Sequence, residues 1–162
     1  GEVDLFAGAL RVLAADGYPV TVFESFHALG GVLRETPMAT LIGDGLASLN
    51  LGRFSILLPF IVAVGLKTAI GSSTVAMITT ASLVSHLLPS MGLATGMGPA
   101  LATLAIATGA MMVSHVNDSY FWVITQMSGL SVSQGYRLVT VASAIAGLTG
   151  MATVFVLSLF LV

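Results

Sequence analysis

The chain has 162 residues, of which 56% are hydrophobic and only 7% are charged, with a formal net charge of −2. About a quarter of the residues of a soluble domain are charged, so this composition predicts an all-α integral membrane protein. The cationic residues are scattered singly, which excludes a nucleic-acid-binding surface. They are Arg11, Arg34, Arg53, Lys67 and Arg137. The absence of cysteine excludes disulfides and thiolate metal sites.

The first third of the chain predicts interfacial and re-entrant segments. Residues 1–17 are amphipathic and too charged to cross a membrane, and residues 20–33 are apolar apart from Glu24 and His27. Over residues 34–51, two short apolar arms surround a polar, glycine-bearing turn, a pattern that we interpret as a re-entrant hairpin. Glu24 and His27 would share a helix face and could handle a proton, although a satisfied buried contact is the more ordinary role of such a pair.

The middle of the chain predicts one full span and one short helix. Arg53 to Ile70 reads as the first full span, kinked at Pro59. Residues 71–74 are typical of a helix start, and the apolar run from Val75 to Leu88 that follows is short for a full crossing.

The C-terminal half begins with a turn over residues 90–99. Helices are then predicted from Leu101 to Met112 and from Tyr120 to Met127, followed by a loop over residues 128–133. The best full span is Gln134 to Val162, which is long and apolar. Small residues in this span predict close contact with another helix. They are Ala142, Ala146, Gly147 and Gly150.

Between the two shorter helices, polar side chains interrupt an otherwise apolar segment. They are Ser114, His115, Asn117, Asp118 and Ser119. Irregular backbone and ionisable groups occur at membrane depth only where they face protein or a water-filled cavity, and transporters place their sites at such breaks. We therefore interpret residues 113–119 as the break of a discontinuous transmembrane helix at a binding site. The alternative is that residues 117–119 simply cap the next helix while His115 bonds to a neighbouring helix.

The polar residues of the break suggest two roles. Ser114, Asn117 and Ser119 could hydrogen-bond a polyhydroxy ligand. His115 or Asp118 could take up and release a proton. These residues alone leave both proton and sodium coupling open.

A second candidate site is the helix start formed by Gly71, Ser72, Ser73 and Thr74. Free N–H groups at a helix start suit an anion, and Lys67, one turn earlier, would add a positive charge. The alternative is a lysine that reaches towards lipid headgroups ahead of an ordinary cap. No metal or other cofactor is expected, because no second histidine or carboxylate cluster stands at ligand spacing near the break.

Two stretches are similar to motifs of the gluconate permease (GntP-type) family of proton symporters. They are Gly-Ser-Ser-Thr-Val-Ala-Met at 71–77 and Ser-His-Val-Asn-Asp-Ser-Tyr-Phe-Trp at 114–122. The resemblance runs in order from about residue 26 to residue 162, but Lys67 stands where arginine would be expected and Tyr120 where glycine is common.

The resemblance implies an ion-transporter-type half with a re-entrant hairpin and discontinuous transmembrane helices. Ser72, Ser73 and Thr74 would lie in one broken region, and Asn117 and Asp118 in the other. It also implies proton-driven import of a small hydroxylated acid, such as gluconate, another sugar acid, glycerate or D-serine, across the bacterial inner membrane.

Length bears on the completeness of such a transporter. The chain begins Gly-Glu-Val-Asp, without methionine or a signal-peptide pattern, and has room for roughly four or five crossings. We therefore expect residues 1–162 to form a single transmembrane domain, the C-terminal part of a longer two-repeat transporter that an N-terminal repeat or a second copy completes.

The first hypothesis is thus a secondary active transporter, with a small anionic hydroxy acid, a proton and the lipid bilayer as its partners. A non-transporting membrane scaffold or subunit derived from such a transporter is the second hypothesis. A third, a membrane-embedded hydrolase, would depend on Ser114 or His115.

Overall fold

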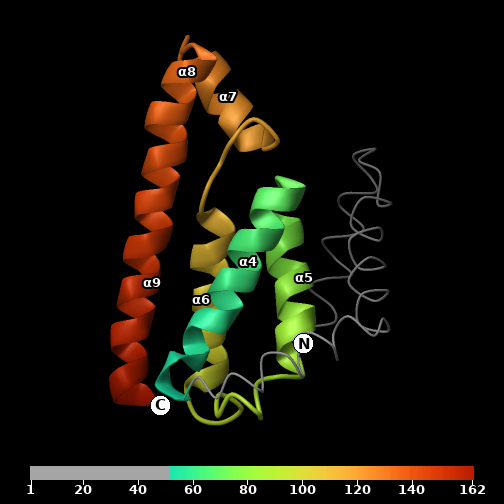
Figure 1. The fold of residues 1–162 in the computed structure, drawn as a ribbon, viewed down its shortest axis with the longest axis vertical. Coiled ribbons are helices and arrows are strands. Elements are labelled where there is room, and N and C mark those ends of the chain that lie inside the picture. The colour runs from blue at the N-terminus through green and yellow to red at the C-terminus, as the bar shows by residue number, and fades with distance from the viewer. Residues whose placement is uncertain (1–51) are drawn as a thin grey trace, which may run out of the picture.

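The computed structural model describes residues 52–162, and in this range the regular secondary structure is all helical, without strands (Figure 1). The expectation of an all-α fold is confirmed for these residues. The re-entrant hairpin expected at residues 34–51 and the pair Glu24 and His27 lie outside the described residues.

The first described elements form a helical hairpin. The 3₁₀-helix η1 (Gly52–Ile56) leads into α4 (Leu57–Ile70), and the chain then reverses into α5 (Ser73–Ser85). Gly71 ends α4 with a φ of 77° and donates its N–H to the carbonyl of Lys67, while Ser72 caps α5 by accepting a hydrogen bond from the N–H of Val75. Because Gly71 and Ser72 alone separate them, the two helices lie side by side and antiparallel (Figure 1).

Both arms of this hairpin are short. Phe54–Ile70 and Ser73–Ser85 belong to the apolar helices of 10–17 residues. At 1.5 Å per residue such helices reach at most about 26 Å, less than the ~30 Å hydrocarbon core of a bilayer. The short second arm was predicted, but a full span over residues 53–70 is not confirmed. α4 also runs unbroken past Pro59, because this proline lies in its first turn, where it is tolerated.

The predicted interruption is present between α6 (Gly98–Met111) and α7 (Ser119–Met127). The two helices follow one ascending path, and residues 112–118 cross between them without helical structure (Figure 1). α6 starts earlier than the sequence suggested, because Pro99 stands at its beginning, where a fixed φ favours the helix. The interruption was predicted at residues 113–119 and is observed at residues 112–118, whereas the discontinuous transmembrane helix stays a prediction.

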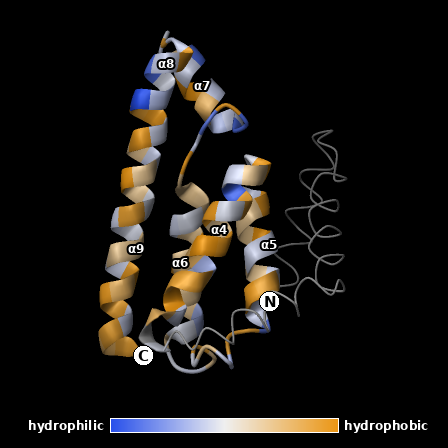
Figure 2. Cartoon of the chain, viewed as in Figure 1, coloured by the Kyte–Doolittle hydropathy of each residue, from blue (hydrophilic) through white to orange (hydrophobic). Residues whose placement is uncertain are grey.

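The C-terminal segment is one long helix. It combines α8 (Val132–Gly135), the π-helical turn η2 (Tyr136–Thr140) and α9 (Val141–Leu161). Within residues 52–162, Val132–Leu161 is the one helix that is long and apolar enough to cross a membrane, and it covers the span predicted at residues 134–162. Figure 2 shows its long run as mainly hydrophobic, whereas hydrophilic residues gather at the break, at the hairpin tip and around α8.

Helix α6 lies at the centre and packs against α4, α5 and α9. A Cβ on Gly109 would lie 2.5 Å from the carbonyl oxygen of Phe60, so the backbones of α6 and α4 nearly touch. A Cβ on Gly150 would lie 2.6 Å from Thr108, and Gly147 meets Met112 in the same way, which confirms the close helix contact predicted for these two glycines. A hydrophobic core lies between these helices. It consists of Ile56, Phe60, Leu93, Leu101, Ala102, Ala105, Met151 and Val154.

Candidate functional site

The tip of the α4–α5 hairpin meets the break between α6 and α7. Asn117 donates a hydrogen bond from Nδ2 to the backbone carbonyl of Thr68 at 2.8 Å. Gly71 lies so close to the backbone of Asn117 that a Cβ on Gly71 would collide with the Asn117 carbonyl. Position 71 therefore needs glycine both for its left-handed φ and for this close approach. Two regions predicted as separate candidate sites therefore lie in direct contact.

A buried ion pair lies at this junction. The Nζ atom of Lys67 is 2.5 Å from Oδ2 of Asp118, and the two residues are only 1% and 3% exposed. A buried charge without a partner is very unfavourable, so each residue makes the other tolerable here. Lys67 also lies 3.4 Å from the carbonyl of Gly71. It points into the protein and does not reach towards headgroups, which was the alternative role for this lysine.

Asp118 has three hydrogen-bonding partners. Its Oδ1 accepts from the N–H of Tyr120 at 3.0 Å and caps α7. Its Oδ2 accepts from the hydroxyl of Ser114 at 2.6 Å, in addition to Lys67. The capping role that was the alternative interpretation is therefore real, but it occupies only one of the two carboxylate oxygens.

Helix α9 holds the break from the other side. The N–H of Ser114 donates to Oγ of Ser143 at 3.1 Å, and Oγ1 of Thr140 donates to the carbonyl of Ser114 at 2.5 Å. Sequence reasoning missed both Thr140, the last residue of η2, and Ser143 of α9, because single hydroxyl side chains in an apolar span are common and carry no specific signal. The available signal was their spacing, since residues three apart share one helix face.

The backbone of the break is distinctive in two further ways. Val113 has a φ of 53°, a left-handed conformation that is unfavourable for a β-branched residue. The carbonyls of Ser114, His115 and Val116 each accept a hydrogen bond. Thr140 donates to Ser114, as described above. The N–H of Asp118 donates to His115 at 2.8 Å, and Nε1 of Trp122 donates to Val116 at 2.6 Å. These three carbonyls of the irregular segment are therefore paired with protein donors.

A cavity of about 590 Å³ lies beside the junction, between the break, α7 and the first half of α9. The polar residues that line it are Ser73, Ser114, Tyr120 and Ser143. The other lining residues are aliphatic or methionine. Of the predicted site residues, Ser73 and Ser114 line it.

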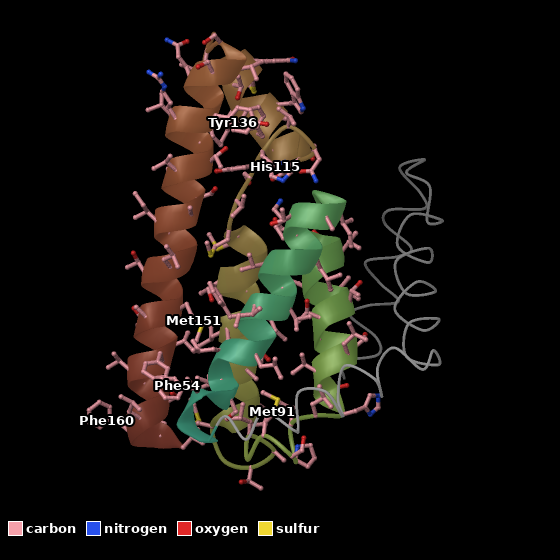
Figure 3. The ribbon with its side chains drawn as sticks, in the orientation of Figure 1. Phe54, Met91, His115, Tyr136, Met151 and Phe160 are labelled. Carbon is pink, nitrogen blue, oxygen red and sulfur yellow. The ribbon has the colours of Figure 1, made fainter. Side chains whose placement is uncertain are left out.

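The other predicted site residues lie around the junction with fewer contacts. Figure 3 shows His115 in the break above the hairpin, and its Nδ1 accepts from the N–H of Asn117 at 3.4 Å. The hydroxyl of Ser72 is engaged in the α5 cap. Thr74 and Ser119 are exposed, and neither lines the cavity. Among residues 52–162, no group of three or more histidine, cysteine or acidic residues could hold a metal ion.

Comparison with known proteins identifies the relatives of this chain. The family described as GntP family permease matches residues 21–160. A gluconate permease of Pseudomonas aeruginosa is 33% identical over 154 residues, which cover 94% of this chain and 34% of that protein. The inner membrane permease YgbN of Escherichia coli is 39% identical over 126 residues, covering 75% of this chain and 26% of the permease. The D-serine transporter DsdX of Escherichia coli is 33% identical over 131 residues, covering 80% and 29%. No solved structure matches the chain.

The chain thus spans between about a quarter and a third of the length of these relatives. They are permeases and transporters and not enzymes, which removes the hydrolase hypothesis. With a family match over most of its length, the chain belongs to the GntP family of membrane permeases.

Proposed function

We propose that this chain is part of a proton-coupled symporter that takes up gluconate or a related small hydroxy acid across the inner membrane. Relatives named as gluconate permeases and as a D-serine transporter support a small substrate that bears a carboxylate. The observation that carries the proposal is the buried pair of Lys67 and Asp118, at which the hairpin tip meets the broken helix.

In this proposal α4 and α5 form a re-entrant hairpin, and α6 and α7 form a discontinuous transmembrane helix. Two observations support this topology: both arms of the hairpin are short, and their tip stops at the level of the break. An ion-transporter-type protein needs a second half, so we assign residues 1–162 to the C-terminal part of a two-repeat transporter.

The proposed substrate-binding residues surround the ion pair. They are Lys67, Gly71, Ser72, Ser73, Thr74, Ser114, Asn117 and Ser119. Asp118 is the proposed proton carrier, with His115 beside it in the break. A proton on Asp118 removes the negative charge that balances Lys67, and the carboxylate of the substrate can then take its place. Proton and acid would bind together because each is unfavourable in this buried site without the other.

Proton coupling rather than sodium coupling is supported by the state of the break carbonyls. Sodium sites at broken helices use unwound backbone carbonyls as ligands. The carbonyls of Ser114, His115 and Val116 already accept hydrogen bonds from Thr140, Asp118 and Trp122.

The test is substrate-dependent proton movement with the native, full-length protein in sealed vesicles. Adding gluconate or a related hydroxy acid outside should acidify the vesicle interior, and a proton uncoupler should abolish accumulation of the labelled acid. Accumulation of the acid above its external concentration that persists with the uncoupler would contradict proton coupling. No uptake of any hydroxy acid by correctly inserted protein would favour the non-transporting scaffold instead.

A further inference from the structure

We propose that Ser114 couples proton binding to acid binding by exchanging its hydrogen-bond partner. In the empty site its hydroxyl donates to the carboxylate of Asp118. Once Asp118 carries the proton, the hydroxyl accepts from Asp118 and donates instead to the carboxylate of the acid at Lys67. This inference rests on the proposed function and adds the group that links its two binding events.

The first argument is that two donors meet at one oxygen atom. Oδ2 of Asp118 accepts from Nζ of Lys67 at 2.5 Å and from the hydroxyl of Ser114 at 2.6 Å. A substrate carboxylate that replaces Asp118 as the partner of Lys67 therefore comes within reach of the Ser114 hydroxyl. Lys67 and Ser114 thus form a pair of donors that can bind one carboxylate oxygen together.

The second argument concerns the oxygen of Asp118 that receives the proton. Oδ1 accepts from the backbone N–H of Tyr120 at 3.0 Å, and this donor is fixed in the first turn of α7. Oδ1 therefore stays an acceptor, and the proton binds to Oδ2. A protonated Oδ2 needs an acceptor, which Oγ of Ser114 supplies and the ammonium group of Lys67 cannot. The hydrogen bond between Ser114 and Asp118 then reverses and frees the hydroxyl hydrogen of Ser114.

The third argument is that the backbone of Ser114 is held on both sides. Its N–H donates to Oγ of Ser143 at 3.1 Å, and its carbonyl accepts from Oγ1 of Thr140 at 2.5 Å. Ser114 itself is buried, with 3% of its surface exposed. Rotation of the hydroxyl hydrogen about the Cβ–Oγ bond is enough for the exchange, so the break can keep its backbone conformation.

The charged groups around Asp118 are few in the part of the chain that the structure describes. Lys67 is its ion-pair partner, and α5, α6 and α9 contain no charged or titratable residue. Arg137 of η2 is exposed, and tyrosines titrate far above neutral pH. Histidine titrates near neutral pH, so His115 in the break would contribute alike in the native protein and in a Ser114 variant. A difference between these two proteins in the pH dependence of binding therefore reports on Asp118.

The partner exchange predicts an effect of Ser114 that depends on pH. At alkaline pH the hydroxyl donates to the Asp118 carboxylate before the acid binds and to the acid afterwards, so it exchanges one carboxylate for another. At acidic pH Asp118 is already protonated, and donation to the acid is a net gain. Removal of the hydroxyl should therefore weaken acid binding at acidic pH alone.

The decisive experiment measures the KM for labelled gluconate at acidic and at alkaline external pH, with the native, full-length protein in sealed vesicles. We expect Ser114→Ala to raise the KM about tenfold or more at acidic pH, through loss of a hydrogen bond to a charged group, and by less than about threefold at alkaline pH. Ser114→Thr keeps a hydroxyl and should keep the native pattern. An equal rise at both pH values would show that Ser114 only supports the structure of the break, which would overturn this inference and leave the proposed function intact.

Two further variants complete the test. Ser114→Cys has nearly the native size and a weaker donor, so it should show the same pH-selective rise to a smaller extent even if Ser114→Ala fails to fold. Ser158→Ala is the matched control, because Ser158 is a buried serine of α9 whose hydroxyl donates to the carbonyl of Phe155 at 2.7 Å. It should keep the native KM at both pH values, and a pH-selective rise there would also overturn the inference. A native KM that does not change with pH would contradict proton binding at Asp118 and overturn the proposed function as well.

Discussion

The Nζ atom of Lys67 lies 2.5 Å from Oδ2 of Asp118, although the two residues are 51 positions apart in the chain. This pair joins the end of α4 to the start of α7, and both helices terminate at the junction. The charges that hold the hairpin tip against the break are thus the same charges that the proposed mechanism separates. Binding and release of the acid would then act directly on the contact between the two elements.

Removing one partner of this pair should be strongly destabilising. Asp118→Asn retains an oxygen for the α7 cap but leaves Lys67 buried without a counter-charge, which costs about 3–5 kcal/mol. Thermal unfolding of the purified protein in detergent would measure the loss. The double variant Lys67→Met with Asp118→Asn removes both charges and should recover most of the stability while uptake stays absent. Equal stability of Asp118→Asn and the native protein would show that the pair is not buried as described.

The contact between Gly71 and Asn117 predicts that position 71 requires glycine for lack of space as well as for its positive φ. Gly71→Ala should abolish uptake, because the new methyl group would collide with the Asn117 carbonyl. Gly92→Ala is the matched control: Gly92 has a similar φ of 71°, and a Cβ there meets nothing within 4 Å. The control should lose about 1–2 kcal/mol of stability, the cost of holding alanine in a left-handed backbone conformation, and should keep its uptake. Similar uptake by the two variants would refute the close approach.

Asn117 should be essential through its amide. Asn117→Ala removes the hydrogen bond to the carbonyl of Thr68, so the hairpin tip loses its hold on the break and the proposed substrate loses a donor. We expect uptake to be abolished while the protein still inserts into the membrane. Gln126→Ala removes an exposed amide from the neighbouring helix and should transport normally. Normal uptake by Asn117→Ala would remove this residue from the site.

Local properties of the sequence were sufficient to predict most helices and the break. The run of polar residues from Ser114 to Ser119 stands in an apolar background, and such contrast locates an interruption whatever the tertiary structure. The ends of α7 and the long apolar span were predicted closely for the same reason. The bounds of the helix over residues 53–70 were also predicted closely, but hydropathy does not show whether an apolar helix of this length crosses the membrane.

Pairing between distant segments could not be predicted in this way. Nothing near Lys67 in the sequence indicates that its partner is Asp118, since that contact depends on how α4 packs against α6. The left-handed conformation of Val113 could not be predicted either, because valine disfavours this conformation and only the surrounding contacts impose it. The residues of α9 that hold Ser114 became visible only with the fold.

The last prediction concerns Thr140 at the end of η2. Thr140→Val keeps the size of the side chain but removes the donor to the Ser114 carbonyl, which should cost about 1–3 kcal/mol because that acceptor is left unpaired. With the break less firmly held, Ser114 should position Asp118 less well, and uptake should fall by several-fold or more. Thr153→Val is the control, since Thr153 is exposed on the same helix and bonds only to the carbonyl of Thr149. Thermal unfolding and initial uptake rates would measure both effects. If the two variants behaved alike, α9 would serve only as a membrane span, and the hold on the break would have to come from the hairpin alone.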